Sequence, residues 1–146
     1  MRVMFVCLGN ICRSPMAEMI MKEMVKKEGL SSEIFVSSSG ISDEEEGNGM
    51  YPPAQKILIE KGIKVEERCA KKITQEDIFE YDYIVVMEKY QKDRILKNYI
   101  VSNPSKVECL NNKDVLDPWY TGDFLTTYEE IYQGCSQLLK KIKKEL

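Results

Sequence analysis

MRVMFVCLGNICRSP (residues 1–15) contains, in order, a strand, a turn and the start of a helix. RVMFV (2–6) is a short run rich in β-branched and aromatic residues, which predicts a buried strand. A helix is expected to start near Ser14, because serine is a favoured N-cap and Pro15 suits the first helical position. Cys7 therefore falls at the carboxyl end of the strand, just before the turn.

The remainder of the chain continues this alternation of strands and helices. DYIVVME (82–88) is the clearest central strand, since YIVVM is apolar throughout, as expected of a strand covered on both faces. Such alternation is typical of an α/β fold. We predict one domain over 1–146 with a four-stranded parallel doubly wound sheet and helices on both faces. The other expected strands are 33–39 and 106–110. Further helices are expected at 54–62, 74–80 and 88–98, and a last helix is expected to begin with a capping box at Thr127-x-x-Glu130. The expected loops are 40–53 and 111–124.

The composition narrows the class of protein. With 43% hydrophobic and 31% charged residues the chain is expected to be globular, and a net charge of -3 gives no reason to expect nucleic acid or an anionic membrane as a partner. No apolar run approaches the ~20 residues of a transmembrane helix. VMFVCL (3–8) is too short for a signal-peptide core. We therefore expect a cytoplasmic protein with neither a nucleic-acid nor a membrane partner.

The cysteine and histidine counts exclude several kinds of chemistry. The five cysteines are an odd number and are scattered, unlike the disulfide framework of a secreted protein. Cys7 and Cys12 have the wrong spacing for a zinc knuckle, and the chain has no histidine, so no metal site is expected. The missing histidine also excludes Ser-His-Asp and Cys-His hydrolases. Acid–base chemistry near neutral pH is left to Asp, Glu, Cys, Lys or Tyr.

The loop after the first strand has the features of an anion-binding site. Backbone N–H groups and a helix dipole attract negative charge at the carboxyl ends of parallel strands. Gly9 allows a tight turn, Asn10 tolerates a left-handed conformation, and Arg13 supplies a planar fork that matches two phosphate oxygens. In this field Cys7 is expected to be a thiolate aimed at phosphorus, and Ser14 can donate its hydroxyl to the sulfur. The predicted phosphate-binding loop comprises Leu8, Gly9, Asn10, Ile11, Cys12, Arg13 and Ser14.

A phosphoryl transfer also needs a proton donor for the leaving oxygen, and DVLDPWYTGD (114–123) offers one. Asp117 precedes Pro118, which stiffens the chain, and Trp119 and Tyr120 follow. The two aromatic rings are suited to line a slot for an aromatic leaving group. We therefore predict Asp117 as the acid, with Trp119 and Tyr120 in a substrate slot.

CLGNICRSP (7–15) followed by DPWY (117–120) resembles the low-molecular-weight protein tyrosine phosphatases, and the likeness covers essentially the whole chain. The resemblance implies that Cys7 becomes phosphocysteine and that Arg13 binds the phosphate. It implies that Asp117 protonates the leaving phenolate and then activates water. It implies that Cys12 pairs reversibly with Cys7 under oxidant, as a redox partner. No metal or cofactor would be required, and the partners would be phosphotyrosine proteins or peptides, inorganic phosphate and similar oxyanions.

The chain departs from the family pattern at three places. Where relatives often carry an aromatic residue in the slot, it has three consecutive glutamates, Glu44–Glu46. A slot wall containing Glu44 would repel acidic peptides and favour basic ones, whereas the alternative interpretation is a solvated charge run. Many relatives brace the phosphate loop through Asn10 with a histidine near Arg68, and this chain has none. Glu88 stands where an aspartate is common.

Other activities share parts of this pattern. Protein-arginine phosphatases resemble the chain but tend to carry Thr in place of Ile11 and Gly in place of Tyr120. Arsenate reductases share the C-x5-R loop but rely on a further cysteine pair, and Cys69 is alone in its region. A phosphate-binding module without catalysis would need neither Cys7 nor Asp117. A tyrosine phosphatase is therefore the leading prediction.

Overall fold

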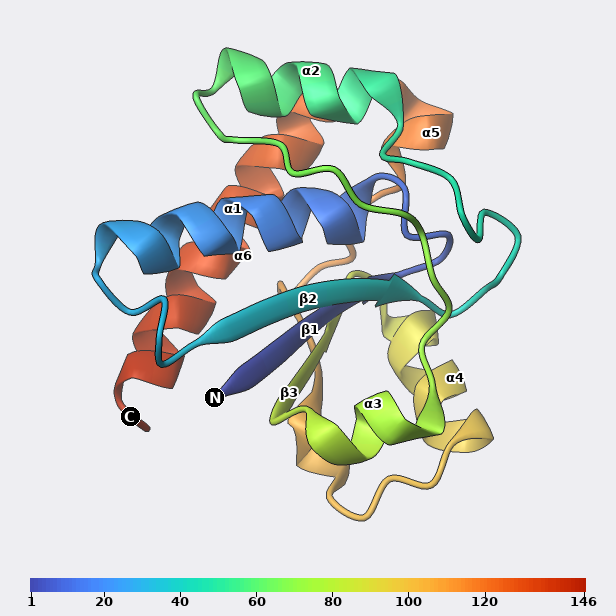
Figure 1. Ribbon diagram of the computed structural model, residues 1–146. Coiled ribbons are helices and arrows are strands. Elements are labelled where there is room, and N and C mark those ends of the chain that lie inside the picture. Colours follow the sequence, from blue (N-terminus) through green and yellow to red (C-terminus); the bar gives the residue numbers. More distant parts are fainter.

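The computed structural model describes residues 1–146 as a parallel sheet between two layers of helices (Figure 1). The sheet order is β2-β1-β3-β4, and every neighbouring pair is parallel. This confirms the predicted α/β class with a four-stranded, doubly wound parallel sheet. The strands are β1 (Arg2–Cys7), β2 (Phe35–Gly40), β3 (Tyr83–Val86) and β4 (Val107–Cys109).

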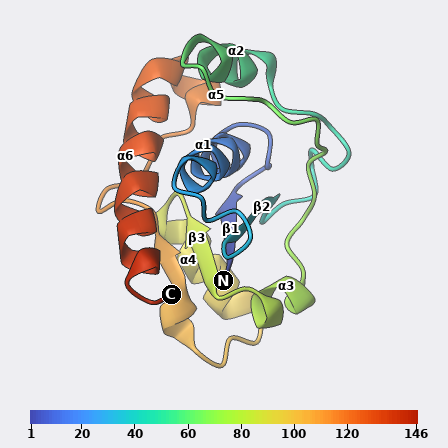
Figure 2. The same cartoon turned by 60° about the vertical axis from the view of Figure 1, so that its left-hand side comes forward.

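Helices cover both faces of the sheet, with α1, α2 and α6 on one side and α3 and α4 on the other (Figure 1). The view in Figure 2 looks nearly along α1 and shows α6 running beside it. No helix is both long enough and apolar enough to cross a membrane. The helices are α1 (Arg13–Lys27), α2 (Pro52–Glu60), α3 (Gln75–Glu80), α4 (Lys89–Asn98), the 3-10 turn η1 (Pro104–Lys106), α5 (Pro118–Thr121) and α6 (Phe124–Lys143).

Strand β1 divides its side chains between two hydrophobic clusters. Val3 and Phe5 pack into the larger cluster, with side chains of α1 and α6, whereas Met4 and Val6 pack with side chains of α3 and α4. All four are completely buried, and each contributes roughly 1.5–3 kcal/mol on burial. Cys7 has the same parity as Phe5 and belongs to the larger cluster. The alternation of the strand therefore turns Cys7 toward the layer that contains α1.

The register of the sheet brings the carboxyl ends of the strands together. Cys7 lies opposite Gly40, and Val86 lies opposite both Val6 and Cys109. The segments that leave β1, β2, β3 and β4 therefore start at one edge. This is the edge at which parallel α/β sheets bind ligands.

The last helix begins before the position expected from the sequence. Asp123 is its N-cap and accepts a hydrogen bond from the Thr126 N–H at 3.0 Å. The capping box predicted at Thr127 is therefore wrong: Thr127 is buried, and its hydroxyl donates to the Asp123 carbonyl at 3.1 Å. The segment 111–124, predicted as a loop, contains the short helix α5, because Asp117 caps it and Pro118 suits its first turn.

The first helix also starts differently. It begins at Arg13, with Cys12 in the N-cap position and no side-chain cap hydrogen bond. The prediction that Ser14 caps this helix is therefore wrong. The Ser14 hydroxyl is completely buried and is used inside the loop, as described below.

Candidate active site

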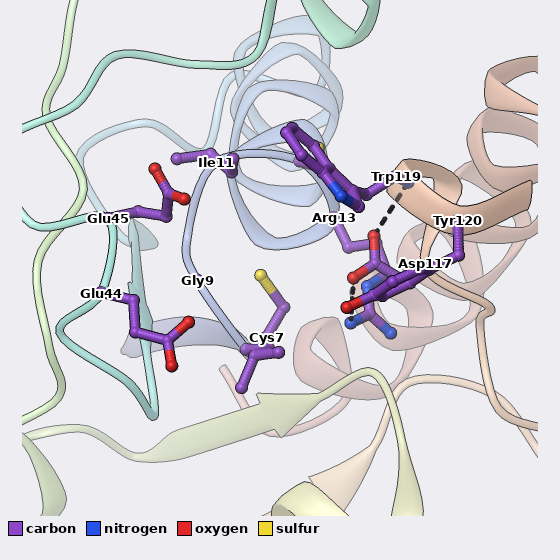
Figure 3. A pocket seen from close by; sticks show the side chains of 11 residues that line it. Cys7, Gly9, Ile11, Arg13, Glu44, Glu45, Asp117, Trp119 and Tyr120 are labelled. Atoms are coloured by element: carbon purple, nitrogen blue, oxygen red, sulfur yellow. Dashed lines mark hydrogen bonds and ion pairs between the residues drawn. The ribbon is translucent and has the colours of Figure 1, made fainter. Parts of the chain in front are cut away.

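A pocket of about 170 Å³ opens above the carboxyl end of β1 (Figure 3). Cys7 lies at its base, between an acidic side and an aromatic side. Of the predicted site residues, Asn10 and Ser14 do not line it; they lie behind the loop and are buried. The lining residues are Cys7, Leu8, Gly9, Ile11, Cys12, Arg13, Glu44, Glu45, Asp117, Trp119 and Tyr120.

The backbone of the loop leaves its donors free. No N–H group from Leu8 to Ser14 donates a hydrogen bond to another atom of the chain. Backbone N–H groups near a protein interior normally have a partner, so a run of free ones marks a place for an acceptor. Asn10 has a φ of 60°, in the left-handed region, as the sequence suggested. Free donors at the start of α1 favour an oxyanion above Cys7.

Asn10 and Ser14 tie the loop to the thiol. The Asn10 amide donates from Nδ2 to Ser14 Oγ at 2.7 Å and to Ser38 Oγ at 3.0 Å. Ser14 Oγ lies 3.0 Å from Cys7 Sγ. Asn10 Oδ1 accepts from Arg68 Nη2 and from the backbone N–H of Lys71. All four hydrogen-bonding positions of the Asn10 side chain are therefore filled.

Arg13 is held beside Cys7 by three groups from distant parts of the chain. Its Nη1 donates to Glu88 and to the Val115 carbonyl, the latter at 2.7 Å, and its Nη2 lies 3.5 Å from Asp117 Oδ2. The side chain is 2% exposed. Burial alone would lower the pKa of the guanidinium, but the charges of Cys7, Glu88 and Asp117 outweigh it and raise the pKa. Arg13 is therefore a fixed, oriented cation.

The aromatic side of the pocket is carried by α5. Asp117 accepts from the Trp119 N–H at 3.0 Å, which caps the helix and holds the carboxylate toward Arg13. Trp119 and Tyr120 flank Asp117 in Figure 3 and are 53% and 80% exposed. Tyr51 supports Trp119 from behind, with ring centroids 4.7 Å apart. The pocket is therefore open to solvent on the side that carries the rings of Trp119 and Tyr120.

The acidic side is fixed to the phosphate loop. The Ser42 N–H donates to the Leu8 carbonyl at 3.0 Å, and the Tyr51 N–H donates to the Ile11 carbonyl at 2.9 Å. These two bonds hold both ends of the segment that carries Glu44 and Glu45. Both carboxylates face Cys7 across the pocket from Asp117 (Figure 3). Glu44, which was predicted for the slot, lines the pocket, and Glu45 is a second acid in its lining that was not predicted individually.

Cys12 differs from Cys7 in its surroundings. Burial, with the nearby charges of Cys7 and Asp117, raises the pKa of the Cys12 thiol to about 12. Cys12 is therefore a neutral thiol at physiological pH. It lines the same pocket as Cys7, and neither cysteine is in a disulfide.

Gly40 is expected to be essential to the shape of the loop. A Cβ at this position would lie 2.8 Å from the Leu8 carbonyl oxygen and 3.2 Å from the Asn10 nitrogen, both of which are backbone atoms. Gly40→Ala must therefore shift the loop by a few tenths of an ångström, which we expect to lower kcat/KM about tenfold or more. Gly49→Ala is the matched control, because its Cβ would make only an ordinary contact, 4.0 Å from the Arg68 carbonyl oxygen. Equal kcat/KM values for the two variants, at similar melting temperatures, would contradict this account.

Several contacts of the site were not expected from the sequence. They involve Tyr51 behind Trp119, Ser38 behind Asn10, and the Val115 carbonyl at Arg13. Only Ser38 had a visible signal, because it lies in a run of three serines within a segment expected to be a strand. Backbone groups such as the Val115 carbonyl leave no signal in the residue types.

Comparisons with known proteins agree with this geometry. The family model described as low molecular weight phosphotyrosine protein phosphatase matches residues 2–146. The low molecular weight protein-tyrosine-phosphatase YfkJ of Bacillus subtilis is 37% identical over 98% of this chain and 96% of its own. Its crystal structure superposes with a TM-score of 0.95, covering 99% and 96% of the two chains.

Relatives from other organisms show the same agreement. The low molecular weight phosphotyrosine protein phosphatase of Sus scrofa is 34% identical over 97% of this chain and 95% of its own. The structure of SP-PTP, a low molecular weight protein tyrosine phosphatase from Streptococcus pyogenes, has 37% identity and a TM-score of 0.87, covering 96% and 91% of the two chains. The chain therefore belongs to the low molecular weight phosphotyrosine protein phosphatase family, whose members are phosphoric monoester hydrolases.

Proposed function

We propose that the chain hydrolyses phosphotyrosine in proteins or peptides through a phosphocysteine intermediate on Cys7. The free N–H groups from Leu8 to Ser14 carry this proposal, because they surround Cys7 and can donate hydrogen bonds to the three non-bridging oxygens of a phosphate. Arg13 can add a bidentate contact to the phosphate through Nε and Nη2, because Nη1 already donates hydrogen bonds to Glu88 and to the Val115 carbonyl.

In the first step the Cys7 thiolate attacks phosphorus and the bond from phosphorus to the phenolic oxygen breaks. Asp117 in its acid form gives its proton to the leaving oxygen. Arg13 stays in place and contacts the phosphate, where it stabilises the charge on the equatorial oxygens. The products are tyrosine and Cys7 with a bond from sulfur to phosphorus.

In the second step water replaces the phenol. The Asp117 carboxylate takes a proton from the water, whose oxygen attacks phosphorus in line with Cys7. The bond from sulfur to phosphorus breaks, the electron pair returns to sulfur, and the Ser14 hydroxyl donates to the thiolate that forms. Inorganic phosphate leaves. The route uses side chains and backbone of the chain alone, without a metal ion or cofactor.

Phosphate release from a phosphotyrosine peptide tests this function. The assay is run in EDTA and dithiothreitol, with a phosphoarginine peptide and arsenate alongside. Turnover of phosphotyrosine with little release from phosphoarginine supports the proposal. Turnover of phosphoarginine alone would move the chain to the arginine phosphatases with the same mechanism. Thiol-dependent arsenate reduction, or phosphate binding without turnover, would reject it.

The acidic side of the pocket is expected to select substrates by charge. Peptides with lysine next to phosphotyrosine should have a kcat/KM about tenfold higher than peptides with glutamate there, because Glu44 and Glu45 repel like charges at short range. We expect the double variant Glu44→Gln, Glu45→Gln to remove most of this preference. Glu46→Gln is the matched control, since Glu46 belongs to the same loop but does not line the pocket. A preference that survives the double variant, or that is insensitive to salt, would contradict this role.

Two further expectations belong to the same proposal. A reversible disulfide between Cys7 and Cys12 would protect the nucleophile from irreversible oxidation: a peroxide oxidant would convert Cys7 to a sulfenic acid, and Cys12 would condense with it to form the disulfide and release water. The odd number of scattered cysteines fits a reducing compartment, and we infer the cytoplasm.

A further inference from the structure

A cavity of about 360 Å³ lies between helix α4 and the segment that precedes α3. Two of its residues belong to the hydrophobic cluster that contains Met4 and Val6, so it lies on the face of the sheet opposite to α1 (Figure 1). The cavity shares no residue with the active-site pocket. Its lining consists of Ile41, Lys72, Arg94, Ile95, Asn98 and Tyr99.

The charged side chains of this cavity are all positive. They are Lys72 and Arg94, and the lining contains no aspartate or glutamate. By contrast, carboxylates line the active-site pocket, the cavity between α1 and β2, the cavity on α6 and the cavity beside α5. In a chain with a net charge of -3, the cavity is therefore a local positive field that attracts anions.

The polar groups of the lining have no partner within the chain. The other three arginines each contact an acceptor side chain. The Arg94 guanidinium and the Lys72 ammonium form no ion pair, and the Asn98 amide forms no hydrogen bond. An unpaired cation alone is common on a protein surface. Here two cations and an amide line one concave site, which leaves their N–H groups available to a ligand.

The two walls of the cavity are fixed relative to each other. On one side Lys72 pairs with Gly40 at the end of β2. The Gly40 N–H donates to the Lys71 carbonyl and the Ile73 N–H donates to the Gly40 carbonyl, both at 2.8 Å. On the other side Tyr99, which follows α4, donates from its hydroxyl to the Ile73 carbonyl at 3.0 Å. The site is therefore preorganised, which lowers the entropic cost of binding a ligand between the walls.

The lining combines polar donors with an apolar part. Arg94 and Asn98 are four residues apart in α4 and therefore lie on the same side of the helix. Ile41 and Ile95 are 8% and 0% exposed and supply the apolar part. Apolar surroundings keep water away from a bound anion and strengthen its attraction to the two cations. This distinguishes the cavity from cations that are simply solvated.

We propose that this cavity is a second phosphate-binding site, which takes inorganic phosphate or the phosphate group of a phosphorylated protein. The planar fork of Arg94 matches two phosphate oxygens, and the Lys72 ammonium and the Asn98 amide can donate to a third. A carboxylate has only two oxygens and would leave one donor unused. The volume exceeds the 170 Å³ of the active-site pocket, so the ester of a phosphorylated side chain also fits.

The test is an NMR titration of the isotope-labelled protein with inorganic phosphate at constant ionic strength. The backbone amides of Lys72, Ile73, Arg94 and Asn98 should shift with one common Kd. The double variant Lys72→Gln, Arg94→Gln should weaken binding at these amides about tenfold or more, because two charge-assisted contacts are lost. The shifts of the amides from Leu8 to Ser14, which report the active site, should stay as in the wild type.

The double variant Lys92→Gln, Lys97→Gln is the matched control. It removes the same charge from α4, but neither residue lines the cavity. Binding at the cavity should therefore remain as in the wild type. Equal weakening in this control, or equal shifts with chloride, would show a diffuse attraction to positive charge and would reject the site. If Lys72→Gln, Arg94→Gln does not fold, Arg94→Gln alone is compared with Lys97→Gln by the same criteria.

The titration separates this site from the proposed catalytic function. Shifts confined to the amides from Leu8 to Ser14 would reject the second site and leave the function of Cys7 untouched. Shifts at the cavity alone would support the second site and count against phosphate binding above Cys7.

A phosphoserine peptide distinguishes the two sources of phosphate. It is titrated into Cys7→Ser, in which we expect no turnover, and compared with inorganic phosphate. Binding at the cavity that is about tenfold tighter for the peptide would identify a phosphorylated protein as the ligand, since tenfold is well outside the error of such titrations. Equal or tighter binding of inorganic phosphate would identify the free ion. No shift at the cavity with either compound would overturn the proposal.

Discussion

Replacing Cys7 by serine is expected to abolish phosphate release from phosphotyrosine while leaving phosphate binding intact. The serine hydroxyl is not ionised at neutral pH, and removal of the nucleophile of a covalent mechanism costs on the order of 10⁴-fold to 10⁶-fold in kcat. The free N–H groups from Leu8 to Ser14 and the guanidinium of Arg13 remain in Cys7→Ser, so a phosphotyrosine peptide should still bind.

The measurement combines turnover with calorimetric binding of the peptide. Cys69→Ser is the control, because Cys69 is an exposed thiol outside the pocket. Rapid quenching of the wild-type reaction should also trap a phosphate group on Cys7, which mass spectrometry detects. Residual turnover above about 1% of wild type in Cys7→Ser would exclude Cys7 as the nucleophile, given the size of the expected loss.

Replacing Asp117 by asparagine is expected to lower kcat for phosphotyrosine about 10²-fold to 10⁴-fold. Asparagine can keep the N-cap hydrogen bond to the Trp119 N–H, so α5 should stay in place while the change removes the proton and the carboxylate charge that faces Arg13. The loss should be largest for a phenyl phosphate, whose leaving oxygen is strongly basic. It should be smallest for a nitrophenyl phosphate, whose leaving group hardly needs a proton.

Kinetics with a series of substituted phenyl phosphates measure this dependence directly. Asp93→Asn, an exposed change in α4, is the control and should give wild-type slopes. A uniform loss for all leaving groups would mean that Asp117 positions Arg13 rather than donating a proton. The second step offers a further check, because Asp117→Asn should prolong the lifetime of the phosphocysteine.

Much of the fold was predictable because strands and helices alternate with distinct residue patterns. YIVVM in β3 is apolar on both faces, and β1 divides its side chains between two clusters, as a central strand of a doubly wound sheet must. The helix starts were less predictable. Asp123 and Thr127 are both good capping residues, and only the packing of the buried Thr127 decides which one is used.

The site was predictable where one stretch of chain carries the chemistry. The loop from Leu8 to Ser14 and the proposed acid Asp117 follow from residue types at strand ends, and the pocket brings them to one edge of the sheet. The supports of the loop were not predictable in the same way. Arg68 and Tyr51 come from the long segment after β2, whose path depends on tertiary packing rather than on a periodic pattern.

The order of the strands in space has a consequence for biosynthesis. β1 is made first but lies between β2 and β3, and Arg13 is held by groups that follow β3 and β4. A nascent chain that has emerged only as far as β2 therefore has the proposed nucleophile Cys7 but not the contacts that orient the Arg13 guanidinium. It also exposes one edge of β1 until β3 arrives. Catalytic competence appears only when the C-terminal half is in place, so enzymatic activity can serve as a reporter of completed folding on the ribosome.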